Sequence, residues 1–163
     1  MKKIRIFIIV LMVLILTGCS DNNVDFSKTN IVTFNDLTVE IPNAFTKDTD
    51  NGTDEMVFYS YSDAEKYNYC SMYLAISNYP DSDMKKAIQE GGFYNKTDWT
   101  YNEKDINGYK WSIGYKEESV KHNKTFYVIN HNGKEYSFNY EDYGSGDKCA
   151  EALKVIEKTL KFN

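Results

Sequence analysis

The sequence predicts an α+β domain in which an antiparallel sheet is covered by a C-terminal helix, with a short helix in the middle of the chain. Three observations support this fold class. Apolar residues recur at every second position over most of the chain, which is typical of half-buried strands. Aromatic side chains are abundant, with 14 Tyr, 9 Phe and 2 Trp, and they suit pleated surfaces. Only near the C-terminus does the apolar spacing become helical.

Three pairs of predicted strands flank short turns rich in Asn. The pairs are 31–34 and 37–41 around Asn35-Asp36, 99–106 and 109–115 around Asn107-Gly108, and 125–130 and 135–140 around His131-Asn132-Gly133. An Asn-Gly pair readily supplies the positive φ that tight hairpin turns require. We therefore expect three antiparallel hairpins.

Two more strands and two helices complete the predicted domain. The strands cover residues 56–61 and 70–77, where apolar and polar residues alternate. A short helix is expected over residues 82–90, because a Pro-Asp-Ser segment precedes it and two glycines follow it. A longer helix is expected over residues 147–161, and its apolar stripe consists of Cys149, Leu153, Ile156 and Leu160.

The N-terminal segment has the features of a bacterial signal peptide. Three basic residues precede eleven consecutive apolar residues, 6–16, which is the layout of such a peptide. The apolar run is shorter than the roughly 20 residues of a spanning helix, although a short retained membrane anchor is the alternative. The residues that follow resemble the lipobox of bacterial lipoproteins: Leu16, Thr17, Gly18 and Cys19.

This resemblance divides the chain into three parts. Residues 1–18 are the signal peptide, residues 19–30 are the lipidated Cys19 with a flexible tether, and residues 31–163 are a single α+β domain. A tether of this length averages about 15–20 Å from end to end. Because two or three acyl chains anchor a protein stably, we expect the outer face of the cytoplasmic membrane as the location and membrane lipid as one partner.

The charge of the mature chain excludes one class of function. Residues 1–18 hold three of the 19 Lys and Arg and none of the 24 Asp and Glu, which leaves 16 basic against 24 acidic residues, a net charge of −8. Arg5 is the only arginine. Nucleic-acid binding depends on clustered positive charge, so we expect no nucleic-acid partner.

The sequence contains no recognisable catalytic motif. The two histidines, His122 and His131, fall in a predicted polar loop and a hairpin turn, where we expect them to be solvated. No nucleophile elbow, zinc-binding helix, phosphate-binding loop or dinucleotide glycine pattern is present. We expect no enzyme activity, no catalytic residues and no cofactor, with a hydrolase based on paired carboxylates as the alternative.

One acidic segment, Asp48 to Glu55, has a composition that is typical of calcium-binding loops. Acidic and amide side chains alternate around Gly52, and such loops supply oxygen ligands to Ca²⁺. The glycine falls one position early, and the twelfth position is Tyr59 instead of a glutamate. We expect a solvated loop and no metal, and calcium binding is the alternative.

Cys70 and Cys149 are both predicted to face the core, one from a strand and the other from the first turn of the last helix. Disulfides form outside the cytoplasmic membrane, and a bridge closing a loop of this length stabilises by about 4 kcal/mol if it is unstrained. The alternative is two separate buried thiols that pack as small apolar side chains.

The order of elements over residues 31–163 resembles the PsbP-like α/β/α sandwich found in small bacterial lipoproteins. The residues that carry the resemblance are VTFNDLTVEIPNAF at 32–45 and ALKVIEKTLKF at 152–162. The resemblance implies a binding or assembly module and supplies no catalytic residues. It leads us to expect a non-enzymatic lipoprotein with an envelope protein as its partner.

A glycan-binding module for the cell wall is the alternative function. Exposed aromatic faces pack against sugar rings, although aromatic stripes on strands more often belong to the core. The candidate side chains are Tyr59, Tyr61, Tyr67, Tyr69, Tyr94 and Tyr101.

Overall fold

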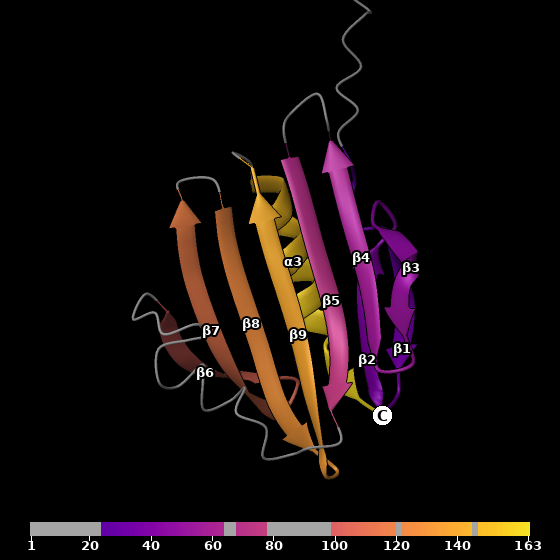
Figure 1. The fold of residues 1–163 in the computed structure, drawn as a ribbon, viewed down its shortest axis with the longest axis vertical. Coiled ribbons are helices and arrows are strands. Elements are labelled where there is room, and N and C mark those ends of the chain that lie inside the picture. Colours follow the sequence, from indigo (N-terminus) through magenta and orange to yellow (C-terminus); the bar gives the residue numbers. More distant parts are fainter. Residues whose placement is uncertain (1–23, 64–67, 78–98, 120–121, 145–146) are drawn as a thin grey trace, which may run out of the picture.

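The computed structural model describes residues 24–63, 68–77, 99–119, 122–144 and 147–163 (Figure 1). The predicted signal peptide, the lipobox with Cys19 and the short helix expected over 82–90 lie outside these residues. Within the described part of the chain, no helix has the length and apolar character needed to cross a membrane.

The larger of two sheets has seven strands in the order β3-β4-β5-β9-β8-β7-β6, and each neighbouring pair is antiparallel. Their bounds are Thr46–Thr53 (β3), Met56–Asp63 (β4), Asn68–Ser77 (β5), Thr100–Ile106 (β6), Tyr109–Ser119 (β7), His122–His131 (β8) and Lys134–Tyr143 (β9). β5 and β9 lie side by side in the centre, paired from Tyr69 opposite Tyr143 to Ser77 opposite Glu135. This pairing joins the two halves of the sheet.

The smaller sheet consists of β1 (Thr29–Phe34), β2 (Leu37–Pro42) and β10 (Lys161–Phe162), with β2 in the middle. The chain that follows β10 is held against the first hairpin, because the backbone N–H of Asn163 donates to the carbonyl of Asp36 at 2.9 Å. The Thr38 hydroxyl also donates to the Asn163 side chain at 3.0 Å. The two ends of the domain sequence therefore share one sheet.

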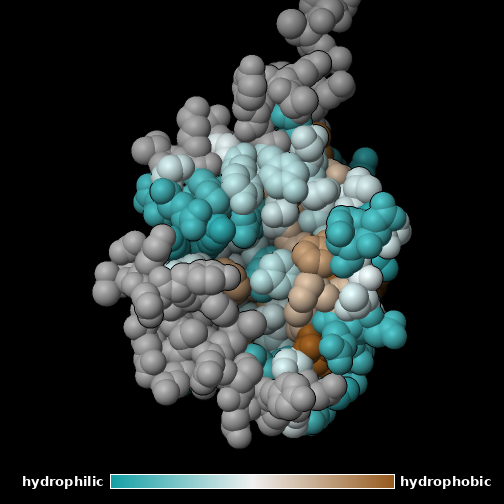
Figure 2. All heavy atoms as spheres, in the orientation of Figure 1, coloured by the Kyte–Doolittle hydropathy of each residue, from teal (hydrophilic) through white to brown (hydrophobic). Residues whose placement is uncertain are grey.

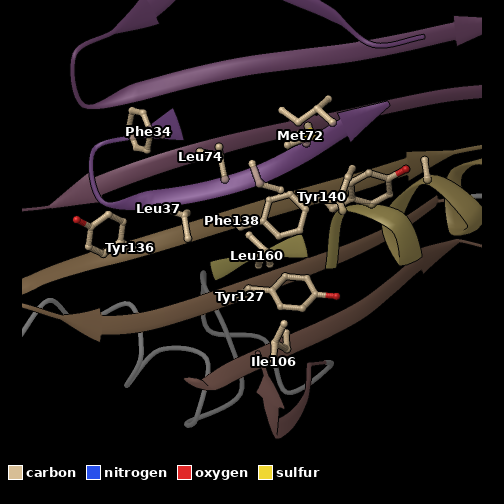
Figure 3. Packing of buried hydrophobic residues seen from close by; sticks show 14 of the residues in the cluster. Phe34, Leu37, Met72, Leu74, Ile106, Tyr127, Tyr136, Phe138, Tyr140 and Leu160 are labelled. Atoms are coloured by element: carbon tan, nitrogen blue, oxygen red, sulfur yellow. The ribbon is translucent and has the colours of Figure 1, made fainter. Parts of the chain in front are cut away.

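The smaller sheet and the helix α3 (Asp147–Thr159) cover the same face of the large sheet, which we call the inner face. In Figure 1, α3 is seen behind β5 and β9, and β2 is seen behind β4. Side chains alternate between the two faces of a strand, so every second residue of β5 and β9 enters the core. Leu74, Phe138 and Leu160 converge there and are fully buried (Figure 3). Each such side chain stabilises the fold by about 1.5–3 kcal/mol.

The domain has two distinct ends along the strand direction. At the upper end in Figure 1, β4, β7 and β9 finish and α3 begins. At the lower end, α3 finishes beside the turns of the β6–β7 and β8–β9 hairpins.

The predicted antiparallel sheet with a covering C-terminal helix is confirmed, whereas the described residues form a sheet-rich domain and do not show the predicted α/β/α sandwich. The three predicted hairpins are present, and Asn35, Asn107 and Asn132 adopt φ values of 54°, 52° and 51°. β7, β8 and β9 extend beyond the predicted ends, because their terminal residues are polar and lack an apolar alternation. The helix ends at Thr159 instead of 161, since Lys161 and Phe162 pair with β2.

The prediction of a solvated loop between Asp48 and Glu55 is wrong. Most of this segment belongs to β3, which pairs with β4 from Thr46 opposite Ser60 and again at Thr53 opposite Met56, with a bulge between them. β3 is an edge strand with mostly exposed residues. A polar edge strand has no buried face to impose apolar alternation, which explains why the sequence gives no signal for it.

The predicted boundary between tether and domain at residue 30 also lies too late. β1 begins at Thr29, and Phe26 is fully buried. The Phe26 ring packs against Tyr61 at a centroid distance of 5.2 Å and against Phe45 at 6.4 Å. The packed part of the chain therefore starts before the first strand, and Val24 also packs partly against the core.

Asn107 should contribute more to stability than its turn conformation alone requires. Its side-chain N–H groups donate to the carbonyls of Lys158 and Leu160, both at 2.8 Å, where the end of α3 leaves carbonyls without helical partners. Asn107→Ala should lower the free energy of unfolding by about 1–2 kcal/mol more than Asn132→Ala does. Urea denaturation of both variants measures the difference.

Asn132 is a matched control, because it has the same positive φ, precedes Gly133 in the same way and makes no side-chain hydrogen bond to the described residues. Equal losses for the two variants would show that the helix-end hydrogen bonds contribute nothing.

Candidate functional site

A disulfide joins the large sheet to the covering helix. Cys70 on β5 and Cys149 in the first turn of α3 are bridged, with Cα atoms 5.7 Å apart and 79 positions apart in the sequence. Both cysteines are fully buried, and the Tyr140 hydroxyl donates to the Cys149 carbonyl at 2.6 Å. Of the two alternatives left open by the sequence, the structure has the bridge. Its buried position makes it a structural link between two layers.

At the upper end, Phe26 closes the core beside the start of α3. Phe26, Phe45 and Tyr61 form a cluster of three rings, and the Lys148 ammonium lies 5.9 Å from the Phe26 ring centre. Aromatic pairs and cation–π contacts of this kind add about 0.5–1.5 kcal/mol each. The segment that leads to Cys19 therefore leaves the packed domain at the upper end.

The outer surface of the upper end carries a row of aromatic rings across three strands. Tyr69 on β5 lies opposite Tyr143 on β9, which lies opposite His122 on β8. The Tyr69 and Tyr143 ring centres are 5.5 Å apart, and His122 stacks on Tyr143 at 3.9 Å. Tyr69 and Tyr143 remain 40% and 37% exposed. We call these three residues the upper aromatic row.

Charged side chains of both signs lie next to the upper aromatic row. His122 Nδ1 lies 3.1 Å from Glu118, and Lys124 lies 3.7 Å from Glu118 and 3.3 Å from Glu141. Burial raises the pKa of the Glu118 carboxyl, but a hydrogen bond from Lys116 and the charge of Lys124 outweigh it and lower that pKa. The Tyr143 hydroxyl donates to Glu141. Each of these charges faces an opposite charge, so the positive and negative charges beside the row largely offset each other.

Asp142, beside this network on the other face of the sheet, has an unusual ionisation. Burial raises the pKa of its carboxyl to about 6, and the nearby His122 opposes the rise. Its Oδ1 atom is buried and has no hydrogen-bond partner among the described residues. Asp142 pairs with Cys70 in the β5–β9 register, and its position next to the disulfide explains its poor access to water.

The two histidines are not the solvated loop residues that the sequence predicted. His122 begins β8 and His131 ends it, and His131 stacks on Phe162 with ring centres 4.0 Å apart. Both are half-buried, because each lies against an aromatic ring from another strand. Their stacking partners come from β9 and β10, which short-range sequence patterns do not reveal.

The Asp48 carboxylate of the acidic segment forms hydrogen bonds within the segment itself. The Asp48 carboxylate accepts the side-chain N–H of Asn51 at 2.6 Å and the backbone N–H groups of Asp50 and Asn51 at 2.9 and 3.2 Å. The hydrogen bond from the Asn51 side chain is the largest cause of the lowered pKa of Asp48. The backbone hydrogen bonds lower this pKa further. Among the described residues, no group of three or more His, Cys, Asp or Glu side chains is arranged to hold a metal ion.

The tyrosines considered for glycan binding do not share one surface. Tyr61 is buried in the ring cluster with Phe26, whereas Tyr69 is exposed on the opposite face of the sheet. Tyr59 and Tyr101 are half-buried on strands at opposite sides of the sheet. Tyr67 and Tyr94 lie outside the described residues.

A groove of about 270 Å³ lies at the lower end between the small sheet and the end of α3. Its lining combines one exposed apolar side chain, Ile31, with polar and charged side chains: Thr38, Glu40, Asn107, Lys158, Thr159 and Lys161. Ile31 is 73% exposed, the highest value among the large apolar side chains of the described residues. This groove had no signal in the sequence beyond the apolar alternation of β1.

The groove has well-fixed polar walls. The Thr29 hydroxyl donates to Glu40 at 2.7 Å, and the Glu40 backbone N–H donates to the Thr159 hydroxyl at 2.9 Å. Thr159 in turn donates to the carbonyl of Ile156 at 2.9 Å. These bonds connect β2 to the last turn of α3. The groove therefore places charged side chains of both signs around Ile31, and hydrogen bonds connect the two elements that form its walls.

No family model and no curated protein matches the chain. Among solved structures, the chain is similar to the Saccharomyces cerevisiae Ran-binding protein Mog1p, with a TM-score of 0.54, 11% identity and coverage of 83% of this chain and 95% of that chain. It is similar to CyanoP, the cyanobacterial PsbP of Synechocystis sp. PCC 6803, with a TM-score of 0.53, 11% identity and coverage of 90% and 99%.

A third similar structure is a protein from Bacteroides thetaiotaomicron, with a TM-score of 0.51 and 10% identity. The match covers 83% of this chain but only 48% of that protein. The described domain thus has a fold of the PsbP and Mog1 type, and the sequence-based resemblance to PsbP is confirmed at the level of the fold.

The disulfide gives a direct test of the packing between β5 and α3. The oxidised protein should gain about 2 Da on full reduction, because two hydrogens are added to the two sulfurs. Replacing both cysteines, Cys70→Ala with Cys149→Ala, should lower the free energy of unfolding by about 4 kcal/mol. Intact-mass analysis and urea denaturation measure the two effects.

Wild-type protein unfolded in the presence of a reductant is the control, and its stability should approach that of the double variant. An unchanged mass after reduction of the denatured chain would contradict the bridge.

Proposed function

We propose that the protein is a lipid-anchored lipoprotein of the cell envelope that binds another protein and catalyses no reaction. The observation that carries this proposal is the groove at the lower end, where Ile31 is exposed among polar and charged side chains. Cys19 in the lipobox-like sequence supplies the anchor, on the outer face of the cytoplasmic membrane. The partner would be a protein of the same compartment.

The groove has the composition of a small protein-binding surface. An exposed aliphatic side chain supplies apolar contact area, while charged and amide groups at the rim supply orientation. Glu40 provides negative charge, and Lys158 and Lys161 provide positive charge. A segment of mixed charge with one apolar side chain would match this arrangement better than a uniformly charged ligand.

The edge position of β1 also supports a peptide-like partner. Among the described residues β1 pairs only with β2, and Ile31 lies in the middle of β1. Extended peptides can bind by adding a strand at such an edge, with side-chain pockets giving specificity. The groove beside Ile31 provides the pocket that this mode requires.

The fold is compatible with protein binding. Mog1p, which shares the fold, is a Ran-binding protein, so a scaffold of this type can present a protein-binding surface. Fold similarity alone does not transfer a partner. The site itself, with Ile31 and its charged rim, is therefore the basis of the proposal.

Cys19→Ala should abolish membrane attachment. Without the thiol no lipid is added, and the chain should remain uncut or be released from the membrane. Detergent-phase partitioning and intact mass of the mature protein measure both effects. Ser20→Ala, which alters the adjacent residue and preserves the thiol, is the control. Normal processing and detergent partitioning of Cys19→Ala would disprove the anchor.

The groove is tested by site-specific photo-crosslinking in the full-length protein within the source cell's envelope. A benzoylphenylalanine at position 31 should cross-link one protein saturably, and the same probe at the exposed Asn130 should not. Excess wild-type protein should compete, while an Ile31→Asp variant should compete at least tenfold less well, a loss of about 1.4 kcal/mol.

Asn130 is a suitable control because it is exposed on β8 of the large sheet and is not one of the residues that line the groove. Equal cross-linking from both positions would contradict a specific groove. Cross-linking to wall glycan without protein would favour the glycan-binding alternative.

A further inference from the structure

The upper end combines two features that the proposed function does not use. The upper aromatic row leaves Tyr69 and Tyr143 more than a third exposed, although their rings are ordered against each other and against His122. Apart from Ile31 in the groove, the large exposed apolar side chains of the described residues are Tyr69, Tyr115 and Tyr143. All three lie in the upper parts of their strands.

The chain that carries Cys19 enters the packed domain at this same end. Phe26 contacts Tyr61, and Tyr61 is followed by Ser62, which lies opposite Tyr69 in the β4–β5 register. Phe26 therefore packs against β4 one position before the residue that pairs with Tyr69 on β5. The start of the packed domain and the upper aromatic row belong to one region of the molecule.

The length of the connecting chain limits how far this region can move from the lipid. Phe26 lies seven positions after Cys19, and seven steps along the chain span at most about 25 Å. The headgroup layer on each side of the hydrocarbon core is roughly 5–8 Å thick. With Cys19 anchored in lipid, the chain therefore keeps the upper end of the domain near the membrane surface.

We infer that Tyr69 and Tyr143 rest on the lipid headgroups of the membrane that holds Cys19, so that the upper end is a membrane-contact surface. This inference rests on the proposed lipid anchor. Tyrosine suits this position because its ring is apolar while its hydroxyl is polar, and it is enriched at membrane–water interfaces.

The surroundings of the row fit a membrane surface of no particular charge. Lys124 lies between Glu118 and Glu141, and the acids that face the row are matched by nearby bases. In Figure 2 the upper part of the visible face is pale over β5 and β9, and strongly hydrophilic over the ends of β7 and β8. Contact should therefore depend on the tyrosine rings and little on anionic lipid, unlike that of basic juxtamembrane clusters.

The contact is tested with the full-length lipidated protein in phosphatidylcholine vesicles that contain a headgroup spin label. A single added cysteine, Ser62→Cys at the upper end or Asn130→Cys near the lower end, carries an environment-sensitive fluorophore. Cys70 and Cys149 are bridged, and Cys19 is lipidated under the proposal, so the added thiol is the reactive one. The label at 62 should be quenched, and the label at 130 should keep its fluorescence.

Tyr69→Ser combined with Tyr143→Ser should reduce quenching at 62 to the level at 130, while flotation with vesicles stays unchanged. Tyr69→Ser alone, which keeps the stack of His122 on Tyr143, should give an intermediate loss. Ile31→Ser is the matched control, because it removes an exposed apolar side chain outside the upper end, and it should leave the quenching unchanged. Vesicles with added phosphatidylglycerol should give the same result.

Equal quenching at 62 and 130, or quenching that survives both tyrosine changes, would overturn the inference while leaving the anchor intact. Fluorophore self-quenching at 62 that grows with protein density, without quenching by lipid, would assign the row to a second copy and overturn it as well. Failure of the wild-type protein to float would refute the anchor, and the membrane contact would fall with it.

Discussion

The architecture depends on how α3 is held against the inner face of the large sheet. Cys149 fixes the first turn of the helix to Cys70 on β5, while Asn107 binds the carbonyls at its other end. Between these points, Ala152 and Ile156 are fully buried. A helix of 13 residues contributes one apolar stripe, so its position has to be fixed at both ends for β2 and β10 to pair beside it.

Local signals in the sequence predicted the parts of the fold that depend on short-range chemistry. Asn35, Asn107 and Asn132 marked three turns, and the stripe through Cys149 and Leu160 marked the helix. β3 was missed because a polar edge strand has no buried face, and the contacts of His122 and Phe26 were missed because their partners are remote in sequence. The groove depends on α3 meeting the small sheet, which no single segment encodes.

The two ends of the domain have different surfaces. The upper end carries tyrosine rings among balanced charges, and the lower end carries Ile31 among lysines, Glu40 and amides. Because α3 runs from the first region to the second, its length of about 20 Å sets a minimum distance between them. The same helix therefore connects the disulfide near the proposed membrane contact to the wall of the proposed protein-binding groove.

The buried position of Phe26 links the anchor to the direction in which the groove points. A tether of eleven free residues would let the domain rotate above the membrane, whereas seven residues ending in a buried ring restrict it to a short radius around the lipid. If the upper end lies on the headgroups, the groove at the end of α3 is held at least the length of that helix above them. A partner would then meet Ile31 from the side away from the membrane, and its binding segment would not have to reach the lipid surface.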